Sequence, residues 1–393
     1  MTDCCIIGGG IIGLSIAREL AGRGLSVRVL TRDAGRDTAS WAAAGIFPPA
    51  PDGPDATANE RFTAFSDRLH RIWAEELRAE TGIDNELEAC GGLYVAADPA
   101  GLTRLADAAA RWAAQGVRFD RLDAPAIASH EPALRPAVDR GGILGGLLLP
   151  DELRIRPPRH LAALERSCRR RGVEITPAEV RDIDVRGDRV ERLVVGGTAA
   201  ESVQAGHYCL AAGAWSGRLA AALGLHVETR PIRGQIALVR LSRPVLGRVV
   251  NHGFEYLVPR RDGRLLVGST LEDAGFAPVT TPEVIARLLA FAHGLLGPLP
   301  DAVLEQSWAG LRPGSADGLP LIGPAPACRN AWVAAGHFRA GLHQSTGTAV
   351  VIADLLTGRT PACDPSPFAP DRPPRPDAVE GLGAFLARAA SPT

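Results

Sequence analysis

The sequence predicts an α/β protein in which a Rossmann-like nucleotide-binding domain is interleaved with a second domain built on a mixed or antiparallel β-sheet. Apolar strands alternate with amphipathic helices near the start, the middle and the end of the chain, whereas the intervening blocks are rich in strands. A glycine-rich turn follows the first strand. With 393 residues, of which 46% are hydrophobic, the chain is long enough to bury two cores.

Composition excludes several classes of protein. The 43 basic residues, all arginine, balance 44 acidic residues, so no strong basic field is available for nucleic acid. Without lysine, Schiff-base catalysis, pyridoxal-phosphate anchoring and a P-loop are excluded. No apolar run is long enough to span a membrane. The chain starts almost directly with a strand, which leaves no room for a signal peptide, and we expect a cytoplasmic protein.

The seven cysteines are scattered without a CxxC pair, and the nine histidines show no ligand spacing. Buried free thiols are the simplest interpretation of the cysteines in strand-like runs. We therefore expect neither a disulfide framework nor a metal site.

The first thirty residues predict a nucleotide-binding βαβ unit. An apolar strand at 4–7 meets the turn Gly8-x-Gly10-x-x-Gly13, an amphipathic helix follows, and a second strand occupies 25–30. Gly8 makes the tight turn, Gly10 lets a pyrophosphate approach the backbone, and Gly13 lets the helix pack on the sheet. The pyrophosphate, beside Ile12, would take the positive end of the helix dipole.

Two points about this unit stay open. The second strand ends at Thr31, where an acidic residue normally holds a ribose, so that either the Thr31 hydroxyl or Asp33 would serve. Both a nicotinamide dinucleotide and FAD fit the motif. FAD is usually buried along its whole length and needs contributions from distant segments of the chain.

The middle of the chain alternates further predicted elements. The small-residue stretch 37–49 suits either a loop lying flat against a ring system or a plain linker. Helices are expected at 58–82, 100–116, 159–172 and near 282–296, and strands at 88–98, 173–180 and 202–217, with a further strand and turn at 141–158. Hairpins are expected at 180–197 and 254–272, and a loop at 124–134. The second hairpin turns at Asp262-Gly263.

A second ligand-facing glycine loop lies near the end of the chain. In "AAGHFRAGLHQSTGTAVVIADLLTG", residues 334–358, Gly336 and Gly341 punctuate a turn that runs into a helix beginning near Ser345. This pattern is typical of backbone that approaches a flat or anionic ligand at a helix N-terminus. The Pro-rich tail 366–393 has no periodicity and would wrap the surface or remain disordered.

Four segments together resemble a known family. They are "GGGIIGLSIARELAGRG", "ASWAAAGIFPP", "YLVPRRDGRLLVGSTLE" and the pair "WAGLRPGSADGLPLIG" with "AAGHFRAGL". They are similar to the glycine oxidases among the D-amino-acid-oxidase-type FAD-dependent amine oxidases, over roughly residues 3–360. The resemblance implies a glutathione-reductase-type FAD-binding domain from 1–85, 149–225 and 307–365, and a substrate domain from 86–148 and 226–306 whose sheet roofs the flavin.

The implied activity is oxidation of glycine, or of a similarly small amine or D-amino acid, to the imine. The imine then gives a 2-oxo acid and ammonia, while O2 is reduced to H2O2. In bacteria this step often feeds the thiazole half of thiamine. A homo-oligomer is expected by analogy alone.

The resemblance also implies site residues. Arg312 would clamp the substrate carboxylate with its planar fork, Tyr256 would donate a second hydrogen bond to it, and Arg339 matches a second active-site arginine. Each also has a structural alternative: Arg312 capping a glycine turn, Tyr256 as a core aromatic residue, and Arg339 tying down its loop. The residues expected at FAD are Gly8, Gly10, Ile12, Gly13, Thr31, Ser40, Ala43, Ala44, Gly45, Val173, Gly213, Trp215, Gly336, His337, Phe338, Arg339, Ala340, Gly341 and Leu342.

Some residues depart from related patterns. His343 and Gln344 stand where relatives often have apolar residues; they would line a more polar pocket, or His343 would lie on the surface, which we favour. Leu271 occupies the place of the oxygen-activating lysine of sarcosine oxidases. Pro313 stands beside Arg312 where a flavin-linking cysteine would be, so FAD is expected to be non-covalent.

Alternative functions remain open within the same chemistry. They include a D-amino-acid oxidase or dehydrogenase and a biosynthetic amine oxidase that acts with a partner protein. A related fold oxidises a modified base in transfer RNA, but the balanced charge argues against that substrate. The sequence does not decide the amine or the electron acceptor.

Overall fold

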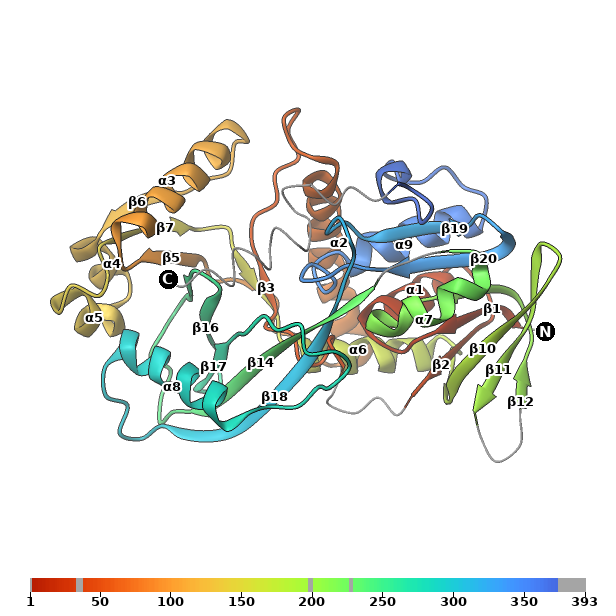
Figure 1. Ribbon diagram of the computed structural model, residues 1–393. Coiled ribbons are helices and arrows are strands. Elements are labelled where there is room, and N and C mark those ends of the chain that lie inside the picture. Colours follow the sequence, from red (N-terminus) through yellow and green to blue (C-terminus); the bar gives the residue numbers. More distant parts are fainter. Residues whose placement is uncertain (1, 33–37, 197–200, 226–228, 374–393) are drawn as a thin grey trace.

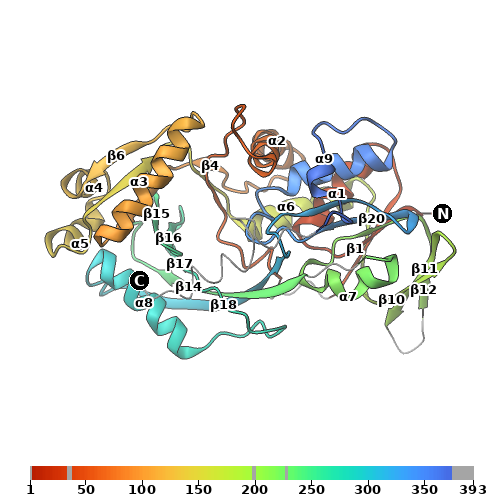
Figure 2. The same cartoon turned by 45° about the horizontal axis from the view of Figure 1, so that its top comes forward.

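The computed structural model describes residues 2–32, 38–196, 201–225 and 229–373, and Asp33 lies outside these ranges. Two sheets organise the molecule (Figure 1), one on the right of the view around α1 and β1, the other on the left around β14 and β18. Turning the molecule by 45° keeps the two bodies distinct (Figure 2). This arrangement matches the α/β class that the sequence predicts.

The six-stranded sheet gathers strands from three separate stretches of the chain. Its order is β19-β20-β13-β1-β2-β9, parallel except for the antiparallel β19–β20 pair. The bounds are β1 Thr2–Ile7, β2 Val27–Thr31, β9 Glu174–Pro177, β13 Ala205–Leu210, β19 Leu321–Ala325 and β20 Cys328–Ala335. β1 is central, and the apolar run Cys4–Ile7 is buried on both of its faces, as expected of an inner parallel strand.

Helices cover one face of this sheet and a small hairpin sheet covers the other. α1 (Ile11–Gly22) packs against α6 (Pro157–Arg170) and α9 (Ser345–Leu356), and α2 (Ala58–Thr81) lies across both. The opposite face packs against α7 (Ser216–Ala220) and the strands β10 (Glu179–Arg186) and β11 (Arg189–Gly196), with β12 (Glu201–Val203) beyond. α2 starts with a capping box between Thr57 and Glu60 and ends at Gly82 in the left-handed conformation.

The eight-stranded sheet forms the second body. Its order is β18-β14-β17-β16-β15-β5-β7-β6, and a small sheet of order β3-β8-β4 lies apart from it. The bounds are β3 Ile46–Phe47, β4 Glu88–Ala89, β5 Gly92–Ala96, β6 Asp120–Asp123, β7 Gly145–Leu149, β8 Leu153–Arg154, β14 Arg230–Arg240, β15 Val249–His252, β16 Glu255–Pro259, β17 Arg264–Gly268 and β18 Val303–Gly314.

One face of the eight-stranded sheet is closed by helices and the other is turned toward the first body. α4 (Ala124–His130), α5 (Arg135–Asp139) and α8 (Pro282–Leu296) bury the apolar side chains of the first face. α3 (Pro99–Ala114) covers β5 and β7 on the other face. The part of that face around Tyr256 packs instead against Ala44 and Ile46 of the N-terminal segment.

Two sequence-based expectations need correction. Residues 124–134 are not a loop: α4 forms there because Asp123 caps its first turn through the Ala126 amide at 2.8 Å, and Pro125 is tolerated in a first turn. β18 belongs to the eight-stranded sheet along its whole length, although the FAD-domain segment was expected to begin at 307. Of the tail, residues up to 373 are described, and Arg372 pairs with the buried Asp317 at 2.8 Å.

Candidate active site

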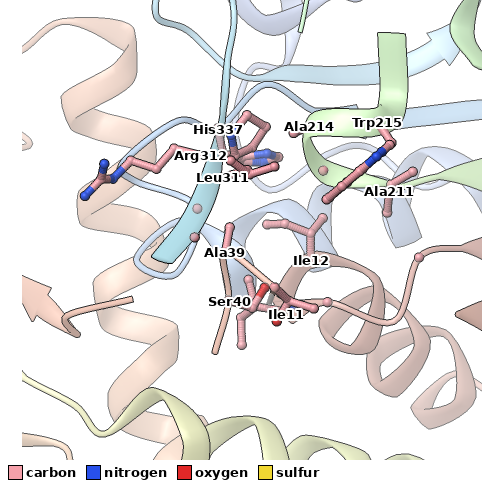
Figure 3. A pocket seen from close by; sticks show the side chains of 18 of the residues that line it. Ile11, Ile12, Ala39, Ser40, Ala211, Ala214, Trp215, Leu311, Arg312 and His337 are labelled. Carbon is pink, nitrogen blue, oxygen red and sulfur yellow. Dashed lines mark hydrogen bonds between the residues drawn. The ribbon is translucent and has the colours of Figure 1, made fainter. Parts of the chain in front are cut away.

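A cavity of about 990 Å³ lies between the two bodies. Its walls come from the β1–α1 turn, the loop 38–46, the segment 178–181, the turn 211–215, strands β16 and β18, and the loop 337–343. Figure 3 shows that Arg312 and Trp215 lie at opposite ends of this space, with His337 between them and Ser40 and Ile12 below. The cavity is therefore elongated and of the size of a large cofactor site.

The glycine turn leaves room for a ligand at the N-terminus of α1. Gly8 has a φ of +117°, and a Cβ there would lie 2.3 Å from the Ala211 carbonyl oxygen. A Cβ on Gly13 would lie 1.9 Å from the Gly8 carbonyl oxygen, so the helix packs directly on the turn. A Cβ on Gly10 would meet only the Ser40 hydroxyl, at 3.0 Å. Neighbouring backbone therefore leaves no room for a side chain at Gly8 or Gly13, whereas there is free space beside Gly10.

The loop 38–46 lies flat along one wall. Ser40 Oγ accepts a hydrogen bond from the Ile11 amide at 2.9 Å, which ties the loop to the start of α1. Trp308 Nε1 donates to the Ala42 carbonyl at 3.2 Å, and a Cβ on Gly310 would lie 2.6 Å from the Ala42 Cβ. Small residues are needed here because the loop and β18 approach each other at backbone distance.

The loop 337–343 is fixed next to β18. The Phe338 amide donates to the Pro313 carbonyl at 2.9 Å and holds Phe338 at a φ of +47°, which is costly for a residue with a side chain. His337 Nε2 is 2.9 Å from Thr348 Oγ1 of α9. Burial lowers the pKa of His337 to about 3, so this imidazole stays neutral at physiological pH.

Arg312 and Tyr256 occupy one face of the eight-stranded sheet. Arg312 donates from Nη1 to the Thr270 carbonyl at 3.1 Å and from Nη2 to Ser269 Oγ at 2.9 Å. A Cβ on Gly234 would lie 2.2 Å from Arg312 Nη1, and one on Gly268 would lie 2.6 Å from the Tyr256 ring. The two glycines therefore let both side chains lie across neighbouring strands.

The charged side chains of the cavity, Arg312 among them, favour binding of an anion. Burial lowers the pKa of Arg312, while the neighbouring Tyr256 phenol raises it. Arg339 also lines the cavity. The surrounding protein lowers the pKa of its guanidinium by desolvation, as it does for Arg312. The described residues that line the cavity include five arginines and one glutamate, namely Arg32, Arg181, Arg218, Arg312, Arg339 and Glu179. Such an excess of positive charge suits a ligand with several negative charges.

These features fit a dinucleotide that carries a large ring system. The amides at the start of α1 and the open Gly10 offer a place for a diphosphate. The flat loop 38–46 and the loop 337–343 supply apolar and backbone surface toward the other end. Among the residues that the structure describes, no cluster of His, Cys, Asp or Glu could hold a metal ion.

Comparison with known proteins decides the family. The model of the DAO family, "FAD dependent oxidoreductase", matches residues 3–355. The chain belongs to this family. This DAO-family member is 34% identical to glycine oxidase from Pseudomonas aeruginosa, over 93% of this chain and 97% of the relative. It is 33% identical to the bifunctional protein ThiO/ThiG of Trichormus variabilis, over 90% of this chain and 52% of that longer protein.

Solved structures agree with this assignment. The crystal structure of glycine oxidase from Geobacillus kaustophilus superposes with a TM-score of 0.87 at 30% identity, covering 94% of this chain and 98% of the other. This DAO-family chain is accordingly an FAD-dependent oxidoreductase with an FAD-binding Rossmann-like domain.

The structure brings most of the expected site residues of this DAO-family chain to the cavity wall. Those that line it are Gly8, Gly10, Ile12, Thr31, Ser40, Ala43, Ala44, Gly45, Gly213, Trp215, Tyr256, Arg312, His337, Phe338, Arg339, Gly341 and Leu342. Gly13, Gly336 and Ala340 are not among the residues that line the cavity. Val173 is 5% exposed in the core, and Val180 lines the cavity in its place. Pro177 ends β9, and the chain reaches the cavity only after it.

His343 is not a surface residue. It is 5% exposed, its Nε2 lies 3.0 Å from Asp67 Oδ1, and its ring stacks on Phe47 at 4.2 Å. It lines the cavity, whereas the fully buried Gln344 does not and instead donates to Asn59 and Thr63 of α2 at 2.9 Å. The alternative of a more polar pocket therefore holds for His343 alone.

The structure also bears on whether the Thr31 hydroxyl is available to hold a ribose. Its hydroxyl donates to the Arg32 carbonyl at 2.9 Å and packs over Gly9. Glu179, at the start of β10, lines the cavity 4.0 Å from Arg32. It is the sole acidic side chain in that wall among the described residues, and sequence analysis missed it because it lies outside the βαβ unit.

A buried carboxyl group near Tyr256 gives a testable pH dependence. Glu152 is fully buried; Tyr94 Oη donates to it at 2.5 Å and Asn251 Nδ2 at 3.3 Å, and Asn251 pairs across the sheet with Tyr256. Burial raises the pKa of Glu152 to about 7, although these hydrogen bonds lower it. Since the folded state holds the proton more tightly than the unfolded state, stability falls as pH rises from the ordinary glutamate pKa toward 7.

We therefore expect Glu152→Gln to remove a pH-dependent loss of stability. Between pH 5 and pH 8 the free energy of unfolding of the native chain should fall by about 2.5 kcal/mol more than that of the variant. Urea denaturation of both proteins across this range measures the difference. Parallel pH profiles would show that Glu152 keeps an ordinary pKa.

Proposed function

We propose that the protein oxidises glycine, or a similarly small amine or D-amino acid, to the imine, which water converts to the 2-oxo acid and ammonia. O2 is the proposed electron acceptor and H2O2 the second product. The observation that carries the proposal is that Arg312 lies at one end of the cavity (Figure 3), with the Tyr256 phenol beside it, while the remaining walls fit FAD.

The roles of the side chains follow from this arrangement. Bound FAD, held without a covalent link, supplies the acceptor for the two electrons of the C–N oxidation. Arg312 binds the substrate carboxylate, because a guanidinium has five donors and two hydrogen bonds to the Thr270 carbonyl and Ser269 leave its fork able to meet two oxygens. Tyr256 donates to the same carboxylate, and Arg339, which also lines the cavity, adds positive charge near Arg312.

Positioning is the main contribution of these residues. A carboxylate fixed at two points leaves the α-carbon of a small amine little freedom, and such restraint lowers the barrier without an acid or base in the central step. The neutral His337 fits this picture, since a charged imidazole would compete with Arg312 for the carboxylate. The apolar side chains of the wall exclude water and strengthen the ion pair.

Similarity to known proteins supports the substrate class. Relatives named glycine oxidase match over nearly the whole chain, and ThiO/ThiG proteins match over about half of theirs. We propose on this basis that the product supplies the thiazole half of thiamine. The seven cysteines are all free, which suits the reducing cytoplasm that we propose as its location. Among the described residues no helix is long and apolar enough to cross a membrane. A homo-oligomer is a further expectation, by analogy with relatives.

An anaerobic titration tests the function. The purified protein is mixed with glycine, sarcosine or D-alanine while the visible absorbance of the flavin is followed. Bleaching by glycine, with peroxide after air is admitted, is the expected result. Bleaching without peroxide would point to a partner protein as electron acceptor. If none of the three amines bleaches the flavin, glycine-type substrates are excluded.

A further inference from the structure

Four side chains form a continuous stack along one wall of the cavity. The Arg32 guanidinium lies 4.0 Å from the centre of the Trp215 ring, the Trp215 and Phe276 rings are 5.6 Å apart, and the Arg218 guanidinium lies 4.1 Å from the Phe276 ring. The two rings thus lie next to each other with a cation at each end, at distances where cation–π and aromatic attraction act. All four line the cavity.

The stack joins the two bodies of the molecule. Arg32 follows β2, and Trp215 and Arg218 lie at the end of the turn after β13 and in α7, all in the FAD-binding body. Phe276 comes from the loop 269–281, which connects β17 to α8 in the substrate body. Of the four, Phe276 is therefore the only one contributed by the substrate body, and it sits between two partners of the other body.

The base of that loop is firmly anchored. Arg233 and Glu272 exchange backbone hydrogen bonds at 2.8 and 2.9 Å and also form an ion pair. Gln235 Nε2 donates to Glu272 at 2.9 Å, and Gln235 Oε1 accepts from the Thr281 amide at 2.8 Å. The loop cannot follow Trp215 freely if the bodies separate, so the aromatic contact at Phe276 must break when they do.

We propose that Arg32, Trp215, Phe276 and Arg218 form a clasp that holds the two bodies closed over FAD and slows its release. The two guanidinium groups also add positive charge to the cavity wall, which suits the diphosphate of the cofactor. Such a clasp lowers the rate of FAD release, because the two bodies must move apart before FAD can leave the cavity. The inference rests on FAD binding and is independent of which amine is oxidised.

Replacing Phe276 with alanine tests the clasp. Free FAD fluoresces more strongly than FAD in a protein of this kind, so dilution of the holoprotein reports the release rate directly. Loss of one aromatic and one cation–π contact predicts release about tenfold faster in F276A. Phe276→Tyr keeps the ring and should release FAD at the native rate. Arg218→Gln removes the last cation and should speed release about threefold.

Matched measurements separate the clasp from a general loosening of the loop. Val279→Ala alters an exposed residue of the same loop, 54% accessible and outside the cavity wall, and should leave the rate unchanged. Equal melting temperatures of the apo forms of F276A and the native chain would show that the fold survives. A native release rate in F276A would overturn the proposal, and so would equal acceleration in V279A and F276A. If F276A does not fold, R218Q decides, and a native rate there overturns the proposal.

Discussion

Replacing Arg312 with glutamine is expected to raise the KM for glycine about a hundredfold while FAD remains bound. Truncating one partner of a desolvated, hydrogen-bonded ion pair costs about 2–5 kcal/mol, and about 2.7 kcal/mol corresponds to a hundredfold change. The guanidinium is held over Gly234 by Ser269 and Thr270, so glutamine cannot reproduce its fork. Steady-state kinetics of peroxide formation, with the flavin spectrum as a record of occupancy, measures both effects.

Two further variants define the origin of the effect. Arg312→Lys keeps the charge but not the planar fork, and we expect a KM between those of the native enzyme and R312Q. Arg329→Gln removes an exposed arginine that pairs with Asp188 at 3.2 Å, and its kinetics should be native. An unchanged KM in R312Q would remove Arg312 from the substrate site and leave it the structural role of tying Ser269 and Thr270 to β18.

Replacing Gly13 with alanine is expected to abolish FAD binding and to destabilise the fold by about 3 kcal/mol or more. The added Cβ would lie 1.9 Å from the Gly8 carbonyl oxygen, which is backbone and has no flexible end to move aside. α1 would have to shift away from β1, and the amides at its start would no longer face the cavity. Urea denaturation of the apo protein and flavin absorbance after purification report the two losses.

Gly10 provides the matched control. A Cβ there would meet only the Ser40 hydroxyl at 3.0 Å, so Gly10→Ala should change the free energy of unfolding by less than about 1 kcal/mol. It should still weaken FAD binding, because the methyl group enters the space left for the ligand. Similar stability in both variants would contradict the assigned packing of α1 on the turn.

Local patterns in the sequence were sufficient for the βαβ unit of the FAD-binding body and for the longer helices of both bodies. The strand at 4–7, the turn Gly8 to Gly13 and the helix after it are encoded by neighbours, and β1 and α1 form there. α2, α3, α6 and α8 likewise lie where hydrophobic periodicity places them. The helix α4 was missed because its sequence has a proline and few apolar repeats, and a single capping aspartate, Asp123, sets its start.

The site was harder to predict wherever it depends on distant contacts. Val180 and Glu179 reach the cavity because β9 ends at Pro177, whereas the strand was expected to run on to residue 180, and periodicity alone does not reveal this earlier end. His343 is buried by Asp67 and Phe47, which lie nearly 300 residues earlier in the chain. Phe276 belongs to the cavity only because the substrate body meets Trp215. Such pairings are properties of the assembled fold.

The order of strands in the central sheet has a consequence for synthesis of the protein. β1 lies between β2 and β13, and β13 in turn lies beside β20, which begins at Cys328. The floor of the cavity at Gly8 and its far wall at 337–343 meet only when this last strand has been added. A nascent chain still lacking that segment on the ribosome has the glycine turn but no closed cofactor site. FAD must therefore be captured only after translation has passed residue 343, because the loop 337–343 belongs to the cavity wall.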